Sequence, residues 1–151
     1  MASFQHILVP IDFGAAAQHA LDTAIDLAEK FDSKITLMHA FMIPVAGYDQ
    51  SLVWPFEEHE REAKKALDTV VHATRPRWSK VEGMLMGGCA WELVIEYAKT
   101  GRVTLVCMGT HNRSGIGRIL LGSNADKVVR LSPVPVLTVG AREDLPPAPV
   151  V

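Results

Sequence analysis

Apolar residues in this chain recur with two different periods that alternate from one end to the other. Short runs of consecutive apolar residues, rich in valine and isoleucine, predict buried strands, whereas segments with apolar residues three or four positions apart predict helices. The predicted strands span residues 6–11, 35–41, 80–86, 103–108 and 134–139. The predicted helices span residues 15–31, 57–74, 91–100 and 123–131. Strands and helices therefore alternate along almost the whole chain.

This alternation predicts a parallel sheet, because helices that separate strands act as parallel crossovers. Uninterrupted apolar strands are typical of a sheet that is covered on both faces. We therefore expect an α/β fold, a doubly wound, Rossmann-like sheet of five parallel strands with helices on both faces. In such folds ligands bind beyond the carboxyl ends of the strands, where the strand order reverses. The residues that follow strands 6–11, 35–41 and 103–108 are thus the first candidates for a site.

Two segments follow neither period. Residues 42–56 contain proline and glycine and are predicted to form a long loop, and loops of this length are often functional lids. The aromatic residues of this loop fit either the contact surface of a lid or a cover for the edge of the core. Residues 141–151 hold three prolines and are predicted to be a frayed tail, which leaves residues 1–140 as the domain.

Composition and charge argue against several classes of protein. With 15 basic and 17 acidic residues the formal net charge is −2, which argues against broad, charge-driven binding of nucleic acid. No apolar run approaches the ~18–20 residues of a membrane span, and no secretory signal is recognised. Two cysteines are too few for a disulfide scaffold, and the six histidines lack metal-binding spacing. We expect a cytoplasmic protein without a metal centre of its own.

The segment between the strand at 103–108 and the helix at 123–131 has the composition of an anion site. Residues 109–122 contain four glycines, two arginines and no acid. Ser123 is expected to cap the helix, with Asp126 completing a weak capping box. Backbone N–H groups at a helix start, approached through glycine, suit a phosphate, and a flexible connection with a capped helix fits equally well. The G-x-G-x-x-G fingerprint of dinucleotide-binding proteins is absent. A P-loop is also absent, because Ser123 stands where a P-loop has lysine.

The same segment resembles the nucleotide signature of the universal stress protein family, G-x2-G-x9-G-[S/T]. Gly109, Gly122 and Ser123 occupy its positions, and Asn112 replaces the second glycine. The opening and closing strands also resemble those of the family, so the resemblance covers residues 4–140. Asparagine is the next best residue after glycine at a left-handed position, so the backbone strain is expected to weaken ATP binding by about tenfold or less. The Asn112 side chain, which can crowd a phosphate, is the larger obstacle.

The resemblance implies a five-stranded parallel sheet with ATP lying across the strand ends. The first strand would line the adenine and ribose, the second would flank the base, and the glycine segment would hold the ribose and the phosphates. Carried over by position, the binding residues are Pro10, Ile11, Asp12, His39, Ala40, Met108, Gly109, His111, Asn112, Gly122, Ser123 and Asn124. Mg²⁺ or Mn²⁺ can accompany the ATP. The resemblance also implies a homodimer, for which the C-terminal edge strand is the natural contact, although Pro133 and Pro135 limit which side of it can pair.

Three functions are compatible with these features. The first is a nucleotide-responsive regulatory dimer in which ATP biases the lid loop or a surface for an unidentified protein partner. The second is a slow ATPase, in which Asp12 helps to hold Mg²⁺ and His111 orients water. No lysine stands in the signature segment to stabilise a leaving phosphate, and Arg113 and Arg118 are the candidate substitutes, so hydrolysis is expected to be slow at most. The third is a nucleotide-free dimeric interaction module, in which Asn112 marks a lost site.

Overall fold

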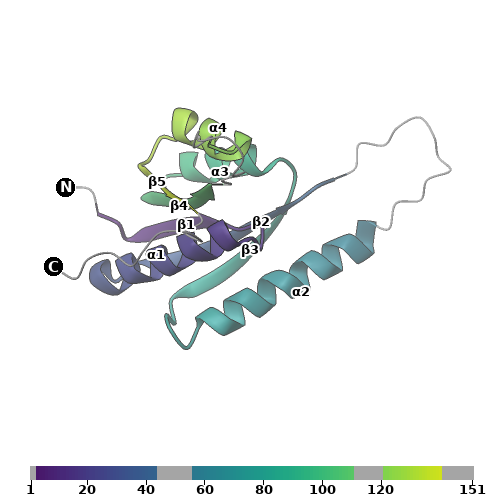
Figure 1. Cartoon of the computed structure of the whole chain (residues 1–151), viewed down its shortest axis with the longest axis horizontal. Helices are drawn as coiled ribbons and strands as arrows, with labels where there is room; N and C mark the ends of the chain where they lie inside the picture. The colour runs from purple at the N-terminus through teal and green to yellow at the C-terminus, as the bar shows by residue number, and fades with distance from the viewer. Residues whose placement is uncertain (1–2, 44–55, 111–120, 141–151) are drawn as a thin grey trace.

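A computed structural model of the chain describes residues 3–43, 56–110 and 121–140. These residues form five strands and four helices in strict alternation (Figure 1). In chain order the elements are β1 (His6–Pro10), α1 (Ala15–Phe31), β2 (Lys34–Phe41), α2 (Phe56–Thr74), β3 (Val81–Gly87), α3 (Ala90–Lys99), β4 (Leu105–Thr110), α4 (Ser123–Leu131) and β5 (Val136–Gly140).

The strands form one sheet in which every pairing is parallel, so the predicted fold class is confirmed. Their order across the sheet is β3-β2-β1-β4-β5. Ile7 of β1 lies in register with Ile35 of β2 on one side and with Leu105 of β4 on the other. The chain thus first extends the sheet on one side of β1 and later on the other. The strand order reverses at β1. The chain segments that connect the strands therefore run to opposite sides of the sheet there, which leaves a crevice beyond the carboxyl end of β1.

Two predicted strands begin two residues later than expected, at Leu105 and at Val136. The buried apolar run at the fourth strand is longer than the segment that pairs. Val103 is buried because it packs into the core formed with α3 and α4, and it lies before the first paired residue. Pro135 contributes only its carbonyl, which accepts the N–H of Val106 at 3.0 Å, because proline has no N–H to donate. Apolar character therefore predicted burial at these positions but not pairing.

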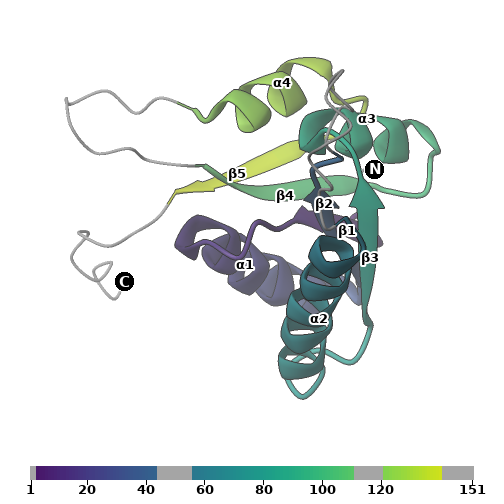
Figure 2. The same cartoon turned by 90° about the vertical axis from the view of Figure 1, so that its right-hand side faces the viewer.

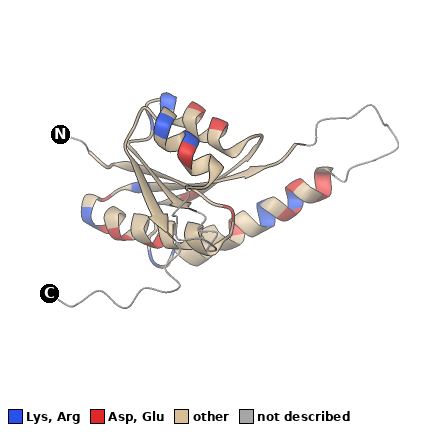
Figure 3. Ribbon diagram, turned by 45° about the horizontal axis from the view of Figure 1, so that its top comes forward, with Lys and Arg blue, Asp and Glu red and all other residues tan. Residues whose placement is uncertain are grey.

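Different helix pairs cover the two faces of the sheet. α1 and α2 pack on one face, and α3 and α4 pack on the other (Figure 2). Ile7 and Val9 of β1 belong to the first core and Leu8 belongs to the second, as the alternation of side chains along a strand requires. The buried face of α1 is rich in alanine, which lets the helix approach the sheet closely. Most of the lysine, arginine, aspartate and glutamate positions lie on the helices rather than on the strands (Figure 3).

Several predicted features fall outside the described residues. The lid prediction falls mostly on residues 44–55, two predicted binding residues fall within residues 111–120, and the predicted tail is residues 141–151. These two residues are His111 and Asn112, of which Asn112 is a signature position. Among the helices that the structure describes, none combines the length and the apolar composition that crossing a bilayer requires.

Candidate functional site

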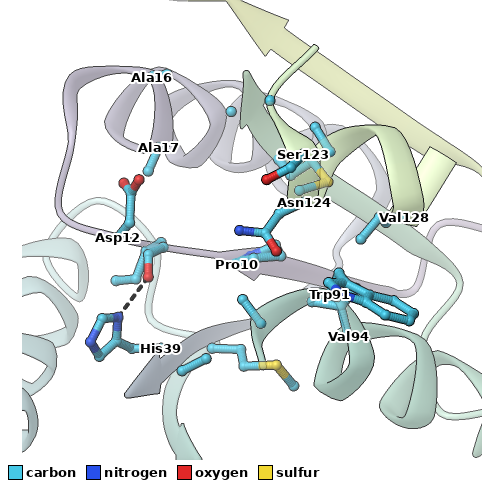
Figure 4. A pocket seen from close by; sticks show the side chains of 18 residues that line it. Pro10, Asp12, Ala16, Ala17, His39, Trp91, Val94, Ser123, Asn124 and Val128 are labelled. Carbon is cyan, nitrogen blue, oxygen red and sulfur yellow. Dashed lines mark hydrogen bonds between the residues drawn. The ribbon is translucent and has the colours of Figure 1, made fainter. Parts of the chain in front are cut away.

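A pocket of about 150 Å³ opens at the carboxyl ends of β1, β2 and β4, next to the first turns of α1, α3 and α4 (Figure 4). Ten of the twelve residues predicted as binding residues lie within the described part of the chain, and all ten line this pocket. They are Pro10, Ile11, Asp12, His39, Ala40, Met108, Gly109, Gly122, Ser123 and Asn124. The other two, His111 and Asn112, lie outside the described residues. Four separate segments of the sequence thus meet at one place.

The turn after β1 holds the carboxylate of Asp12 in a defined position. The backbone N–H of Gly14 donates to Asp12 Oδ1 at 2.9 Å, which is an Asx-type turn. Phe13, between them, has a left-handed backbone with φ of 64°, an uncommon conformation for a bulky residue. In Figure 4 the Asp12 carboxylate points toward α1, beside Ala17. The strained turn therefore places an anionic group at the edge of the pocket.

His39, near the end of β2, braces the end of β1. Its Nδ1 lies 2.8 Å from the carbonyl oxygen of Ile11, and because a carbonyl only accepts, this ring nitrogen carries the proton. The backbone N–H of Ile11 in turn donates to the carbonyl of Met38 at 2.8 Å. The ring of Phe13 packs on the imidazole with 4.5 Å between the ring centroids. His39 lines the pocket and also fixes the strand end that carries Asp12.

The first turn of α4 corrects the predicted helix cap. The N-cap residue is Gly122, with no side-chain cap, and Ser123 is already the first helical residue. The capping-box prediction is therefore wrong: the carboxylate of Asp126 accepts instead from Arg130 Nε at 3.1 Å. A cap residue needs an extended backbone, whereas Ser123 is already helical and so does not occupy the cap position. Figure 4 shows this hydroxyl on the pocket side of the helix.

Gly109 has a packing role that the signature alone does not reveal. A Cβ atom on this residue would lie 2.5 Å from the carbonyl carbon and 2.6 Å from the carbonyl oxygen of Ala16, and 2.7 Å from the backbone nitrogen of Ala17. These are backbone atoms of the first turn of α1, so they cannot move aside as a flexible side chain can. The glycine lets the start of α1 touch the end of β4, which closes one wall of the pocket.

The signature missed the walls that α3 and α4 contribute. Trp91 and Val94 come from α3, and Ala125 and Val128 come from α4. The sequence predicts both helices, but none of these four residues is among the predicted binding residues, because the family resemblance points to strand ends and to the glycine segment. A topological signal was available: α3 starts directly after the carboxyl end of β3, so its first turn must lie at the same edge of the sheet as the pocket.

The charges around the pocket are unevenly distributed. The acidic group is Asp12, and the polar groups of Ser123 and Asn124 stand at the start of α4. A helix start carries partial positive charge, because its first N–H groups have no partner within the helix. None of the described residues that line the pocket is lysine or arginine. Within the described ranges, no three His, Cys, Asp or Glu side chains group closely enough to hold a metal ion.

Comparisons with known proteins agree on one family. The Universal stress protein family matches residues 3–140. Universal stress protein MJ0531 of Methanocaldococcus jannaschii is 27% identical over 139 residues, which make up 90% of this chain and 82% of that protein. The structure of UspA from Lactobacillus plantarum is similar with a TM-score of 0.72 at 22% identity, over 92% of this chain and 99% of that one. The universal stress protein from Archaeoglobus fulgidus, in complex with dAMP, gives a TM-score of 0.65 at 19% identity, over 92% and 99% of the two chains.

Proposed function

Because this chain belongs to the universal stress protein family, we propose that it binds an adenine nucleotide, in the first place ATP, in the pocket at the carboxyl ends of β1, β2 and β4. The observation that carries the proposal is the convergence described above: the residues that the family resemblance implies come from four segments, and those within the described part of the chain line one pocket. The dAMP complex of the Archaeoglobus fulgidus relative supports an adenine nucleotide as the ligand class.

The charges around the pocket favour one orientation of the nucleotide. The amides at the start of α4, with the Ser123 hydroxyl and the Asn124 amide, are donors for phosphate oxygens. The carboxylate of Asp12 repels phosphate and accepts hydrogen bonds from ribose hydroxyls. The triphosphate therefore lies toward α4, and the nucleoside lies across the ends of β1 and β2.

Binding without efficient hydrolysis fits this arrangement best. Phosphoryl transfer needs cationic groups to stabilise the charge that develops on the phosphates. The described pocket offers neutral donors to a phosphate and no lysine or arginine. We therefore assign the protein a regulatory role in the cytoplasm, in which bound ATP changes the surface offered to a protein partner. Phosphate release under excess ATP should remain far below one turnover per second, and sustained faster turnover would contradict this assignment.

Two serines of α4 give a matched test of binding. Ser123 starts the helix at the pocket, whereas Ser132 follows its end, where the hydroxyl donates to the carbonyl of Val134 at 2.8 Å. Ser123→Ala should weaken ATP binding by about tenfold, as expected for a lost hydrogen bond to a charged group. Ser132→Ala should leave the affinity unchanged. Isothermal titration calorimetry measures both variants.

The competing function is a nucleotide-free dimer module. It predicts that millimolar ATP gives no heat of binding with the wild-type protein and that native mass spectrometry finds no co-purified adenine nucleotide. Both results together would refute the nucleotide proposal. If ATP binds equally strongly to Ser123→Ala and Ser132→Ala, the nucleotide proposal stands, but the phosphates do not contact the start of α4.

The outer edge of β5 is the proposed contact between two copies of the chain. Within the described sheet β5 pairs only with β4, and an unpaired edge invites another strand. Leu137 of β5 is exposed, as are Val129 and Leu131 of the adjacent helix α4. An apolar surface of this kind suits a self-complementary interface. Sedimentation velocity should show a dimer, and Leu137→Arg should shift it to the monomer; a wild-type monomer at micromolar concentration would refute the contact.

A further inference from the structure

One wall of the pocket is an aromatic side chain that no signature position covers. Trp91, the second residue of α3, lines the pocket and is half-buried. Lys127 of α4 covers its indole, with Nζ 4.7 Å from the ring centroid. Lys127 is exposed and does not itself line the pocket. The indole therefore contacts an ammonium group that lies outside the pocket lining, while Trp91 itself borders the cavity.

The surroundings of Trp91 are apolar. Val94 and Val128 lie beside it, and Met38 of β2 lies on the floor of the same pocket. In Figure 4, Trp91, Val94 and Val128 stand on the opposite side of the pocket from Asp12. α3 packs against β2, which places the Trp91 wall over the strand whose end carries Ala40. The pocket thus has an apolar, aromatic side at Trp91 and an acidic side at Asp12, and the donors at the start of α4, Ser123 and Asn124, lie between them (Figure 4).

We propose that Trp91 stacks on the base of the bound nucleotide and that Lys127 is a positioning residue that holds the indole in the stacking orientation; this inference rests on the proposed nucleotide site. A nucleotide has groups that suit each part of the pocket: a planar aromatic base for Trp91, charged oxygens for the donors of α4 and ribose hydroxyls for Asp12. Stacking on an aromatic side chain contributes a large share of base affinity. A cation over an indole restrains the ring through its π face.

This assignment predicts that the base half of the pocket works without phosphates. Adenosine should bind to the same pocket as ATP, more weakly, because it makes the indole contact and lacks the contacts to α4. The effect of Trp91 on affinity should therefore be equal for ATP and for adenosine. If Trp91 only supported the fold, its emission would not change when a ligand binds. Equal losses of affinity for ATP and for adenosine, together with quenching of the Trp91 emission, therefore indicate direct contact with the base.

Tryptophan emission tests the contact directly. Bound adenine should quench the emission of Trp91, and Trp91→Phe should abolish the quenching while calorimetry still shows binding within about threefold of wild type. Trp78→Phe is the matched control, because Trp78 packs in the core under α1 and α2 and its Nε1 donates to the Ser33 carbonyl at 2.8 Å. The quenching should survive in this control.

Affinity provides the second measurement. Trp91→Leu should weaken ATP and adenosine alike, by about tenfold. Lys127→Met should weaken both by a smaller, equal factor and should add nothing in the Trp91→Leu background. If Lys127 instead attracts phosphate, Lys127→Met weakens ATP and leaves adenosine unchanged, which overturns its positioning role.

The outcomes separate this inference from the proposed function. If wild-type protein binds neither ATP nor adenosine by calorimetry, the nucleotide site itself is refuted. If ATP binds but the quenching persists in Trp91→Phe, another tryptophan reports the ligand, and the stacking assignment is overturned while the nucleotide site stands. Should Trp91→Leu fail to fold, the Trp91→Phe emission experiment still decides.

Discussion

The two ends of the parallel sheet are built from the same strands in opposite ways. At the amino end, polar side chains are paired with one another or with backbone carbonyls. His6 Nδ1 donates to the Arg102 carbonyl at 2.8 Å, and its Nε2 lies 2.8 Å from the hydroxyl of the fully buried Thr36. The ammonium of Lys34 lies 2.8 Å from Glu82. At the carboxyl end, the crossovers separate on either side of β1 and leave the pocket open.

This difference shows where the fold leaves room for function. Among the described residues, no buried side-chain nitrogen or oxygen lacks a hydrogen-bond partner. The amino end thus contributes stability, while donors at the carboxyl end stand around a cavity. Variants at the carboxyl end should therefore change ligand affinity as well as stability. Variants at the amino end should change stability alone.

The largest effect is expected at Gly109, where the carboxyl end is packed most tightly. Gly109→Ala forces a Cβ to within 2.5 Å of the backbone of Ala16, so α1 must move away from β4. We expect the free energy of unfolding to fall by about 3 kcal/mol, as for severe overpacking. Urea denaturation followed by circular dichroism measures the loss, and ATP affinity should fall with it.

Gly101 is the matched control for that substitution. It follows α3 with φ of 77°, and an added Cβ would meet nothing within 4 Å. Gly101→Ala therefore tests backbone strain without crowding and should cost about 1 kcal/mol. If Gly109→Ala costs no more than Gly101→Ala, α1 is not locked against β4 as the structure indicates.

The sequence predicted the sheet and the edge that carries the pocket because both depend on local patterns. Apolar runs such as that of β1 set burial, and the alternation with helices sets parallel topology. The positions after β1, β2 and β4 then follow from one topological rule. The family resemblance supplied the individual residues, ten of which the structure brings together.

Two of the failures arise from contacts between distant segments, and the third arises from the exact start of a helix. His6 and Arg102 are 96 positions apart and meet only through strand register, so no sequence pattern could pair them. Trp91 faces the pocket because of where α3 begins relative to the sheet, which periodicity does not contain. Ser123 was assigned as a cap because its residue type favours that role, whereas the helix begins one residue earlier than a serine cap requires.

An intermediate effect is expected at His39. His39→Leu removes the donor to the Ile11 carbonyl and should lower the free energy of unfolding by about 1 kcal/mol, the usual contribution of one hydrogen bond. It should also weaken ATP binding severalfold, because the turn that carries Asp12 loses its brace. His39→Gln retains an N–H donor and should recover part of both losses. Unchanged ATP affinity in His39→Leu would show that the brace does not act on the site.

The smallest effect is expected at the amino end and depends on pH. Burial lowers the pKa of His6, against the opposing contribution of its bond to the Arg102 carbonyl. Below about pH 6.5 the unfolded chain therefore binds more protons at His6 than the folded chain does. The contribution of His6 to the free energy of unfolding is consequently lost as the pH falls. The hydrogen bond from Lys34 lowers the pKa of Glu82, whose contribution is lost at more acidic pH, with the same sign. His6→Gln, which can still donate to Arg102, should flatten the decline in unfolding free energy between pH 7 and pH 5.5.

Urea titrations at several pH values measure that decline in the wild type and in His6→Gln. ATP affinity at pH 7.5 should be the same in His6→Gln as in the wild type, because this histidine lies at the opposite end of the strands from the pocket. A His6→Gln variant with weakened ATP binding would show that the two ends are coupled through β1, since that strand carries His6 at its start and Pro10 of the pocket at its end.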